Sequence, residues 1–243
     1  MSEMRVVERQ VSTTALLLPA VLVAAGFALA GYFIGNGLLE ARSASRHVTV
    51  KGLAEREVKA DLVLWPIAFN VTANDLVTLQ KRVDESAAKV RTFLERDFGA
   101  GDDIGQSAPR VNDREGQMVM SGKTLDRYMA EAVVTLRTGQ VEKVRAAMAR
   151  SGELIGQGVA LMRSYEMETQ YLFTGLEAIK PEMIAEATRD ARNAAEQFAH
   201  DSGSRVGSIR TASQGYFSIE DRDRFSPEFK KVRVVTTVEY FLE

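Results

Sequence analysis

The sequence predicts an α+β fold in which mostly antiparallel sheets pack with amphipathic helices, preceded by one N-terminal transmembrane helix. Three observations predict it: an uncharged run near the N-terminus, strand-like alternation of apolar and polar residues in hairpin-like pairs, and helix-like apolar spacing between those pairs. The 243 residues are 45% hydrophobic and 26% charged, which is the composition of a globular protein.

The uncharged run covers residues 10–39, and its apolar centre at residues 15–34 is 20 residues long. At about 1.5 Å of rise per residue, a helix of that length crosses a hydrocarbon layer of roughly 30 Å. In a cleaved signal peptide, a small-x-small cleavage site follows the apolar stretch. Here the large residues Tyr32 and Phe33 lie at that position instead. We therefore expect an uncleaved anchor in the lipid bilayer, with a cleaved signal peptide and a buried helix of a soluble protein as the alternatives.

This anchor divides the chain into three parts. We expect a short tail at residues 1–11, the transmembrane anchor at residues 12–39, and an α+β domain, or two subdomains, at residues 46–243. Positive charges do not decide the orientation, because two arginines lie in the tail and two follow the anchor.

Small residues line one side of the expected membrane helix. Gly31 and Gly35 form a small-x-x-x-small pair, and Ala24 and Ala28 continue the same spacing. Such a strip lets the backbones of two helices approach closely in lipid, so we expect these four residues to contact a second copy of the helix. The alternative is that glycine and alanine are simply common in membrane helices.

The composition excludes several kinds of site. The 31 Lys and Arg residues are balanced by 33 Asp and Glu, which argues against nucleic-acid binding. No cysteine is present, so the chain has no disulfide, thiolate nucleophile or Cys-ligated zinc. The two histidines, His47 and His200, are too few for a multi-histidine metal site within one chain. We expect no catalytic, cofactor-binding or metal-binding residues.

After the anchor, the first expected elements are strands and then a helix. Residues 48–50 alternate as a half-buried strand does, and residues 58–71 carry apolar side chains on both faces, which predicts a central strand covered on both sides. A helix is expected from Asn74-Asp75 to about residue 96, ending at Gly99. Its expected inward positions recur every three or four residues: Leu76, Leu79, Val83, Ala87, Val90 and Leu94.

The remaining elements alternate in the same way. We expect a strand pair with an exposed loop at residues 102–127, a strand at 128–136 and a short helix at 139–152. An alternating segment at 159–172 and a helix whose first turn contains Pro181 follow. The last two elements are expected to be strands at 206–217 and 232–242, separated by a charged loop at 220–224. The helix after Pro181 is expected to end at Ser202-Gly203. Its expected inward residues are Ile184, Ala187, Ala191, Ala195 and Phe198.

Three segments together resemble the SIMPL-domain family of bacterial envelope proteins. The first is residues 48–61, VTVKGLAEREVKAD, where Ala60 replaces the family's proline and Asp61 is retained. The second is the alanine-rich helix at residues 187–199, followed by Gly203, and the third is the closing alternation at residues 232–242.

The resemblance covers about residues 46–242, and it implies an exported α+β domain on the periplasmic side of the bacterial inner membrane. It also implies no established enzymatic activity and, in some relatives, ring- or channel-like homo-oligomers. It supplies no catalytic residues.

Two residue pairs have the spacing of catalytic groups. Glu166 and Glu168 lie two apart on an expected strand, so both carboxylates would share one face, as in a glycosidase; a solvated strand face is the alternative. Ser86 and Lys89 have the Ser-x-x-Lys spacing of some acyl enzymes, but the partner motifs are missing.

Several other residues have two interpretations, as part of a functional site or in a structural role. Glu220, Asp221 and Asp223 can bind a hard cation, although interleaved arginines favour a solvated loop or salt bridges between subunits. Structural roles are expected for both histidines, and core packing for Trp65.

These observations leave three functions to compare. The favoured one is a membrane-anchored periplasmic protein without catalysis that acts by assembling with copies of itself. The second is a ligand-binding envelope module with an apolar pocket lined by Trp65, Phe69 or Tyr171, its small-molecule ligand unknown. The third is a hydrolase using one of the two residue pairs.

Overall fold

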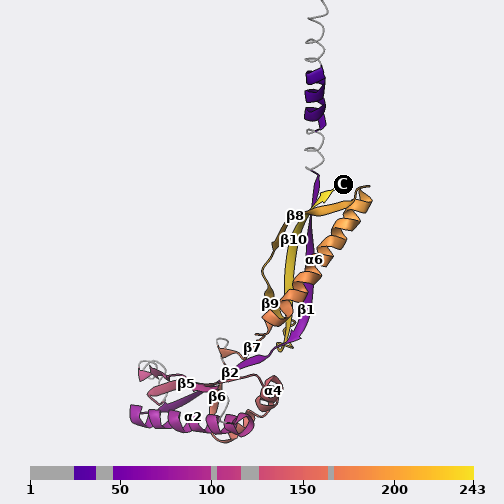
Figure 1. Ribbon diagram of the computed structural model, residues 1–243. Coiled ribbons are helices and arrows are strands. Elements are labelled where there is room, and N and C mark those ends of the chain that lie inside the picture. Colours follow the sequence, from indigo (N-terminus) through magenta and orange to yellow (C-terminus); the bar gives the residue numbers. More distant parts are fainter. Residues whose placement is uncertain (1–24, 37–45, 100–102, 116–125, 164–166) are drawn as a thin grey trace, which may run out of the picture. The chain divides into compact units, whose positions relative to one another are not determined.

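The computed structural model describes residues 25–36, 46–99, 103–115, 126–163 and 167–243, and Figure 1 shows its elements. It confirms an α+β fold, and every pairing with a described register is antiparallel. After helical residues 25–36 the elements are β1 (His47–Lys59), β2 (Leu62–Ala73), α2 (Leu76–Phe98), β3 (Asp103–Gln106), β4 (Arg110–Asp113), β5 (Tyr128–Thr138), α4 (Val141–Ala149), α5 (Gly152–Gly156), β6 (Ala160–Met162), β7 (Gln170–Leu172), α6 (Leu176–Asp201), β8 (Val206–Gln214), β9 (Ser218–Asp221) and β10 (Phe229–Leu242).

The chain divides into two compact units. Unit 1 comprises Met1–Gly52, Thr188–Gln214 and Thr236–Glu243, and unit 2 comprises Leu53–Ala187 and Gly215–Val235. The elements β1, α6 and β10 contribute residues to both units.

The N-terminal anchor is only partly covered by the described residues. Of the expected span 12–39, residues 25–36 are described, and they are helical with exposed side chains. No helix within the described ranges is both long and apolar enough to span a bilayer.

One sheet has the strand order β1-β10-β8, with β9 also paired to β10. β9 pairs with Lys230–Arg233 and β8 with Thr236–Leu242, so the two short strands follow one another along β10. Gly215 lies at the join, where a Cβ atom would come 2.7 Å from the carbonyl oxygen of Val235. Only glycine fits at this close approach, and β8 ends at Gln214 instead of at the expected residue 217.

The other sheet, in unit 2, has β2 and β5 at its centre. The strand order is β3-β5-β2-β6, with β4 also on β5 and β7 also on β2. Cross-strand pairs such as Trp65–Leu136 and Phe69–Ala132 place buried side chains opposite one another on the face that α2 covers. The central position expected for this strand is confirmed, but its other face is half-buried at Leu62 and Leu64 rather than fully covered.

Helix α2 agrees closely with the sequence. Asp75 is its N-cap and accepts a hydrogen bond from the backbone N–H of Thr78 at 2.8 Å, and Gly99 ends it with φ of 76°. The hydrogen bond to Thr78 lowers the pKa of Asp75. One inward position was wrong: Leu76, the first residue of the helix, is 54% exposed.

Helix α6 begins five residues before Pro181, so the expectation that Pro181 lies in the first turn was wrong. Its inward seam follows a four-residue spacing of Ala187, Ala191, Ala195 and Ala199, all buried. Four residues of an α-helix turn through about 400°, which is more than one full turn. Residues spaced by four therefore shift gradually around the helix axis, and Phe198 lies off the packed face. Phe198 is 55% exposed, against the expectation that it lies inward.

Several boundaries also differ from the sequence-based expectation. The alternating segment at 159–172 forms two short strands, β6 and β7, which pair with different parts of β2. The pair expected at 102–127 does not form one hairpin, because β3 and β4 each pair with β5. The strand expected at 58–71 is broken at Ala60-Asp61, where β1 ends and β2 begins.

Replacing Ala191 with leucine tests the alanine seam. Ala191 is fully buried against β1 and β10 of unit 1, together with Val48, Val238 and Tyr240. Ala191→Leu should therefore lower the free energy of unfolding by about 1–3 kcal/mol, the usual cost of overpacking.

The matched control is Ala194→Leu, on the exposed side of the same helix. Chemical denaturation followed by circular dichroism should separate the two variants. Equal stability of both would show that the seam is not packed as described.

Candidate functional site

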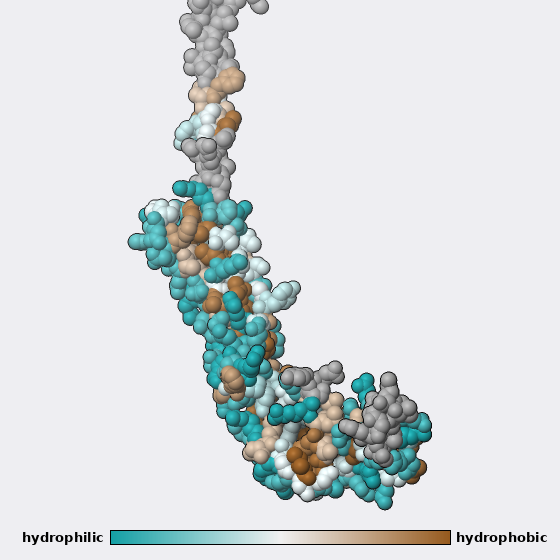
Figure 2. All heavy atoms as spheres, turned by 180° about the vertical axis from the view of Figure 1, so that it is seen from behind, coloured by the Kyte–Doolittle hydropathy of each residue, from teal (hydrophilic) through white to brown (hydrophobic). Residues whose placement is uncertain are grey.

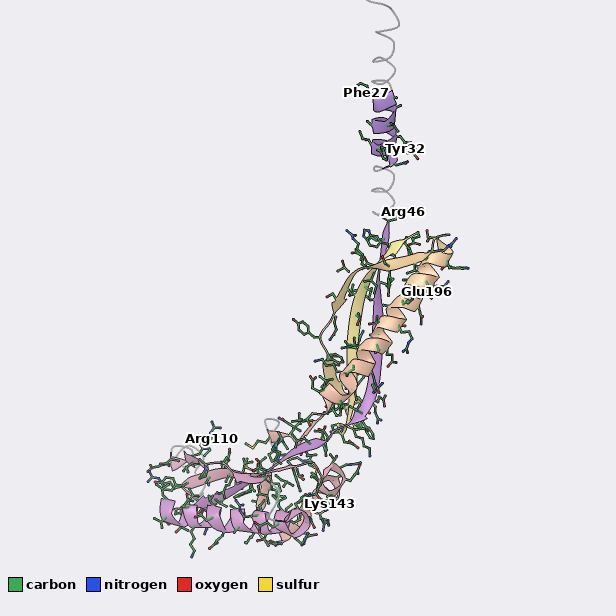
Figure 3. All side chains as sticks on the ribbon, viewed as in Figure 1. Phe27, Tyr32, Arg46, Arg110, Lys143 and Glu196 are labelled. Carbon is green, nitrogen blue, oxygen red and sulfur yellow. The ribbon has the colours of Figure 1, made fainter. Side chains whose placement is uncertain are left out.

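The residues expected to contact a second membrane helix are only partly described. Ala28, Gly31 and Gly35 lie on the helical stretch 25–36, and a Cβ atom added at either glycine would meet nothing within 4 Å. Ala24 lies outside the described residues. Phe27 and Tyr32 project outward from the same stretch (Figure 3), and they are 76% and 65% exposed.

Of the two candidate catalytic pairs, Ser86 and Lys89 are both described, and their side chains lie in different environments. Ser86 is buried in α2, whereas Lys89 is exposed and donates a hydrogen bond to the carbonyl oxygen of Gln157 at 2.9 Å. Glu168 is exposed in an irregular segment between β6 and β7, against the expectation that it lies on a strand. Glu166 lies outside the described residues.

The candidate cation ligands are engaged by neighbouring basic groups. Asp221 pairs with the Lys230 ammonium, and Asp223 accepts a hydrogen bond from Arg222 at 2.9 Å. Glu220 and Asp221 belong to β9 rather than to a loop. Within the described ranges, no group of three or more potential metal ligands occurs.

Both histidines lie beside carboxylates. His47 Nε2 is 3.2 Å from Glu239, which is also 3.6 Å from Arg210, on the first sheet within unit 1. His200 is near the end of α6, 3.4 Å from Asp201.

The aromatic residues proposed to line a pocket instead fill the core of unit 2. Trp65 and Phe69 are 6% and 0% exposed, and Trp65 packs edge-on against Phe93 with ring centroids 6.3 Å apart. The core position of Trp65 is therefore confirmed. Tyr171 is also buried, with its hydroxyl 3.8 Å from the sulfur of Met148. The two hollows described on the surface are lined by other residues.

Asp61, the acidic residue of the first family-like segment, joins distant parts of unit 2. Its carboxylate accepts hydrogen bonds from the backbone N–H groups of Thr174 at 2.8 Å and Gly175 at 2.9 Å, and from the Thr174 hydroxyl at 3.1 Å. Its own N–H donates to the carbonyl oxygen of Leu172. Both carboxylate oxygens are thus occupied by the segment that leads into α6, which indicates a structural role.

A second group of contacts surrounds the start of β10. Glu228 is 7% exposed, and its carboxylate lies 3.0 Å from Arg145 of α4. Lys59 of β1 pairs with Glu142 of α4 at 3.1 Å. Burial and the nearby charge of Glu228 raise the pKa of Tyr171, so the phenol stays neutral well above neutral pH. These pairs hold α4 to β1 and β10.

The turn between β9 and β10 presents an aromatic side chain to solvent. Phe225 is 92% exposed, although the turn around it is fixed by hydrogen bonds. The Asp223 carboxylate accepts the Phe225 N–H at 2.8 Å, and the Phe229 N–H donates to the carbonyl oxygen of Ser226 at 3.0 Å. Arg222 lies over the Phe229 ring at 4.2 Å and holds the pKa of Asp223 below its usual value. An exposed aromatic on an ordered turn is a candidate contact for another molecule.

This turn and the contacts of Asp61 were not found from the sequence. The sequence showed the charges of the turn but gave no sign that Phe225 is exposed or that Arg222 stacks on Phe229. Asp61 was noticed only through the family resemblance.

The family model of SIMPL, described as "Protein of unknown function (DUF541)", matches residues 48–240. The chain belongs to the SIMPL family. No curated protein matches it. A crystal structure of an uncharacterized conserved protein from Listeria innocua is similar over 78% of this chain and 92% of that one, with 16% identity and a TM-score of 0.20. That likeness is too weak to add to the description of this SIMPL protein.

Removing the Asp61 carboxylate should loosen the SIMPL domain at the start of α6. Asp61→Ala leaves the Thr174 and Gly175 N–H groups without their acceptor, so we expect a loss of about 1–2 kcal/mol in unfolding free energy. Asp103→Ala, at an exposed carboxylate on β3, is the control. A Tm for Asp61→Ala equal to that of the control would mean that water replaces these bonds at no cost.

Proposed function

We propose that this SIMPL protein is anchored in the bacterial inner membrane by residues 12–39, holds residues 46–243 in the periplasm, and acts without catalysis by assembling with copies of itself into a ring- or channel-like homo-oligomer. The observation that carries the proposal is the apolar N-terminal run. It has no charge between residues 10 and 39, and its described part is a helix with large apolar side chains exposed.

The exposed side chains of that helix favour a lipid environment. Phe27, Phe33 and Ile34 are 76%, 70% and 64% exposed, which in water would leave a large apolar surface uncovered. Aromatic residues such as Tyr32 and Phe33 near the end of the run suit the interface between lipid and water. Figure 2 shows apolar colour on this stretch, whereas the visible face of the rest is largely hydrophilic with separate apolar patches.

Two features favour assembly over catalysis or ligand capture. Ser86 is buried while Lys89 is exposed and bonded to the Gln157 carbonyl oxygen, and the proposed pocket residues are packed in the core. Large aromatic side chains, by contrast, lie on the surface: Tyr216 is fully exposed and Phe225 nearly so. Aromatic side chains contribute strongly to protein interfaces, so their exposure supports a role in contacts between chains.

Topology can be tested with a reporter fused after Glu243. We expect a reporter that works only outside the cytoplasm to be active, because the anchor would place the C-terminal domain in the periplasm. A matched fusion after residue 11 should be inactive. Activity of a cytoplasm-only reporter after Glu243 would contradict the proposed orientation.

Assembly can be tested by the mass of the detergent-solubilised full-length particle, measured by light scattering. We expect several chains per particle. Gly31→Leu with Gly35→Leu should loosen the particle without dissolving it, because single helix contacts in lipid contribute only about 0.6 kcal/mol on average. Ala28→Leu is a further variant on the same strip.

A chain that begins at Arg46 should still oligomerise, although more weakly than the full-length protein. A monomeric full-length particle would contradict assembly. A monomeric shortened chain at tens of micromolar would leave the membrane helix as the sole interface.

A further inference from the structure

Two exposed surfaces of unit 2 each carry apolar side chains, one beside a positive charge and the other beside an excess of negative charge. The first is the tip of the β9–β10 hairpin, residues 222–228, which we call the hairpin tip. The second is the outer side of the first turns of α2, which we call the α2 surface. It consists of Leu76, Val77, Gln80, Lys81, Asp84 and Glu85.

The hairpin tip is an ordered projection. The Asp223 carboxylate accepts a hydrogen bond from the N–H of Phe225. The Arg222 N–H donates to the carbonyl oxygen of Phe229 at 2.9 Å, so the turn is held at two points. The Phe225 side chain is nevertheless 92% exposed. A residue whose backbone is already held in place loses less conformational entropy when it binds, which makes it an efficient contact residue.

The α2 surface is an apolar area with a charged border. Val77 is 82% exposed and Leu76 54%, on an open and only slightly concave part of the surface. Lys81 lies 4.0 Å from Glu85, and Asp84 accepts a hydrogen bond from Gln80. Two carboxylates against one ammonium leave this border with one net negative charge.

Charge favours contact between the two different surfaces over contact of either with itself. Arg224 stands next to Phe225 and is exposed, whereas the neighbouring Arg222 is paired with Asp223. Two hairpin tips that met would bring Arg224 against Arg224, and two α2 surfaces would bring carboxylates together. A hairpin tip on an α2 surface instead places Arg224 near Asp84 and Glu85 and covers both apolar areas.

We propose that the hairpin tip of one chain docks on the α2 surface of a second copy, with Phe225 over Leu76 and Val77. This interface rests on the proposed homo-oligomeric function. Each chain carries one surface of each kind, so the contact is heterologous and repeats from copy to copy, closing into a ring when the rotation between neighbours allows.

Cross-linking tests the interface, because the chain has no cysteine of its own. The full-length protein in detergent would carry Phe225→Cys with Val77→Cys and be treated with a short bismaleimide. We expect a ladder of dimers, trimers and larger species. Either single variant alone should remain monomeric on a denaturing gel, and a mixture of the two single variants should stop at the dimer.

Tyr216→Cys with Val77→Cys is the matched control. Tyr216 is fully exposed like Phe225, but it precedes β9 and lies outside the hairpin tip. Its cross-linked yield should be at least about tenfold lower. An equal yield, or a dimer from Phe225→Cys alone, would overturn the proposed contact.

A charge exchange tests the pairing directly. Arg224→Glu should reduce the cross-linked yield of the Phe225→Cys, Val77→Cys chain about tenfold, and adding Asp84→Lys with Glu85→Lys should restore it. Failure of the restoration would overturn the role of Arg224. If the particle is an oligomer but no ladder forms, this interface is wrong and the proposed function stands, whereas a monomeric particle overturns both.

Discussion

The fold of unit 2 depends on the Asp61 carboxylate. The chain bends at Ala60-Asp61, where β1 of one sheet is followed by β2 of the other. At this bend the Ala60 N–H donates to the carbonyl oxygen of Glu228, while the Asp61 carboxylate accepts hydrogen bonds from the N–H groups of Thr174 and Gly175. Three segments that are distant in sequence are thereby joined at one point: the β1–β2 turn, the segment before α6, and the start of β10.

Close packing around Asp61 explains nearby glycines. A Cβ atom at Gly139 would lie 3.2 Å from the Asp61 carbonyl oxygen, and one at Gly175 would lie 3.1 Å from the Phe173 ring and 3.4 Å from the Asp61 carboxylate. Larger side chains at these positions would push the turn away from its partners. The ion pairs from α4, Arg145 to Glu228 and Lys59 to Glu142, stabilise the same region from another side. Glu228 is buried, so its partner is needed to offset the cost of removing its charge from water.

The sequence was most informative where local rules determine the structure. Asp75, the apolar spacing of α2 and Gly99 were sufficient to predict that helix nearly to its ends, since capping and amphipathicity are local properties. The alternation of β5 was equally clear. Local rules failed at Pro181, because α6 begins upstream, where Asp61 binds the preceding backbone from 113 residues away.

The candidate interaction surfaces depend on similarly distant relations. Leu76 and Phe198 have helical spacing that predicts burial, but whether they are covered depends on which part of each helix packs on its sheet. The turn that carries the exposed Phe225 is held by the Asp223 carboxylate and by Arg222, which stacks on Phe229 of the next strand, and spacing alone does not reveal these contacts. The family resemblance identified Asp61 as a family-like position, and the structure supplied its role.

The most direct test of this account is hydrogen exchange at the Thr174 and Gly175 amides, measured in the full-length protein and in Asp61→Asn. We expect both amides to be protected in the native protein and to exchange about tenfold faster in Asp61→Asn, because one acceptor oxygen is replaced by an NH₂ group; a factor of ten corresponds to about 1.4 kcal/mol. Amides in the centre of β5 should exchange equally slowly in both proteins. Unprotected Thr174 and Gly175 amides in the native protein, or identical rates in the two proteins, would contradict the claim that Asp61 holds the start of α6 in place.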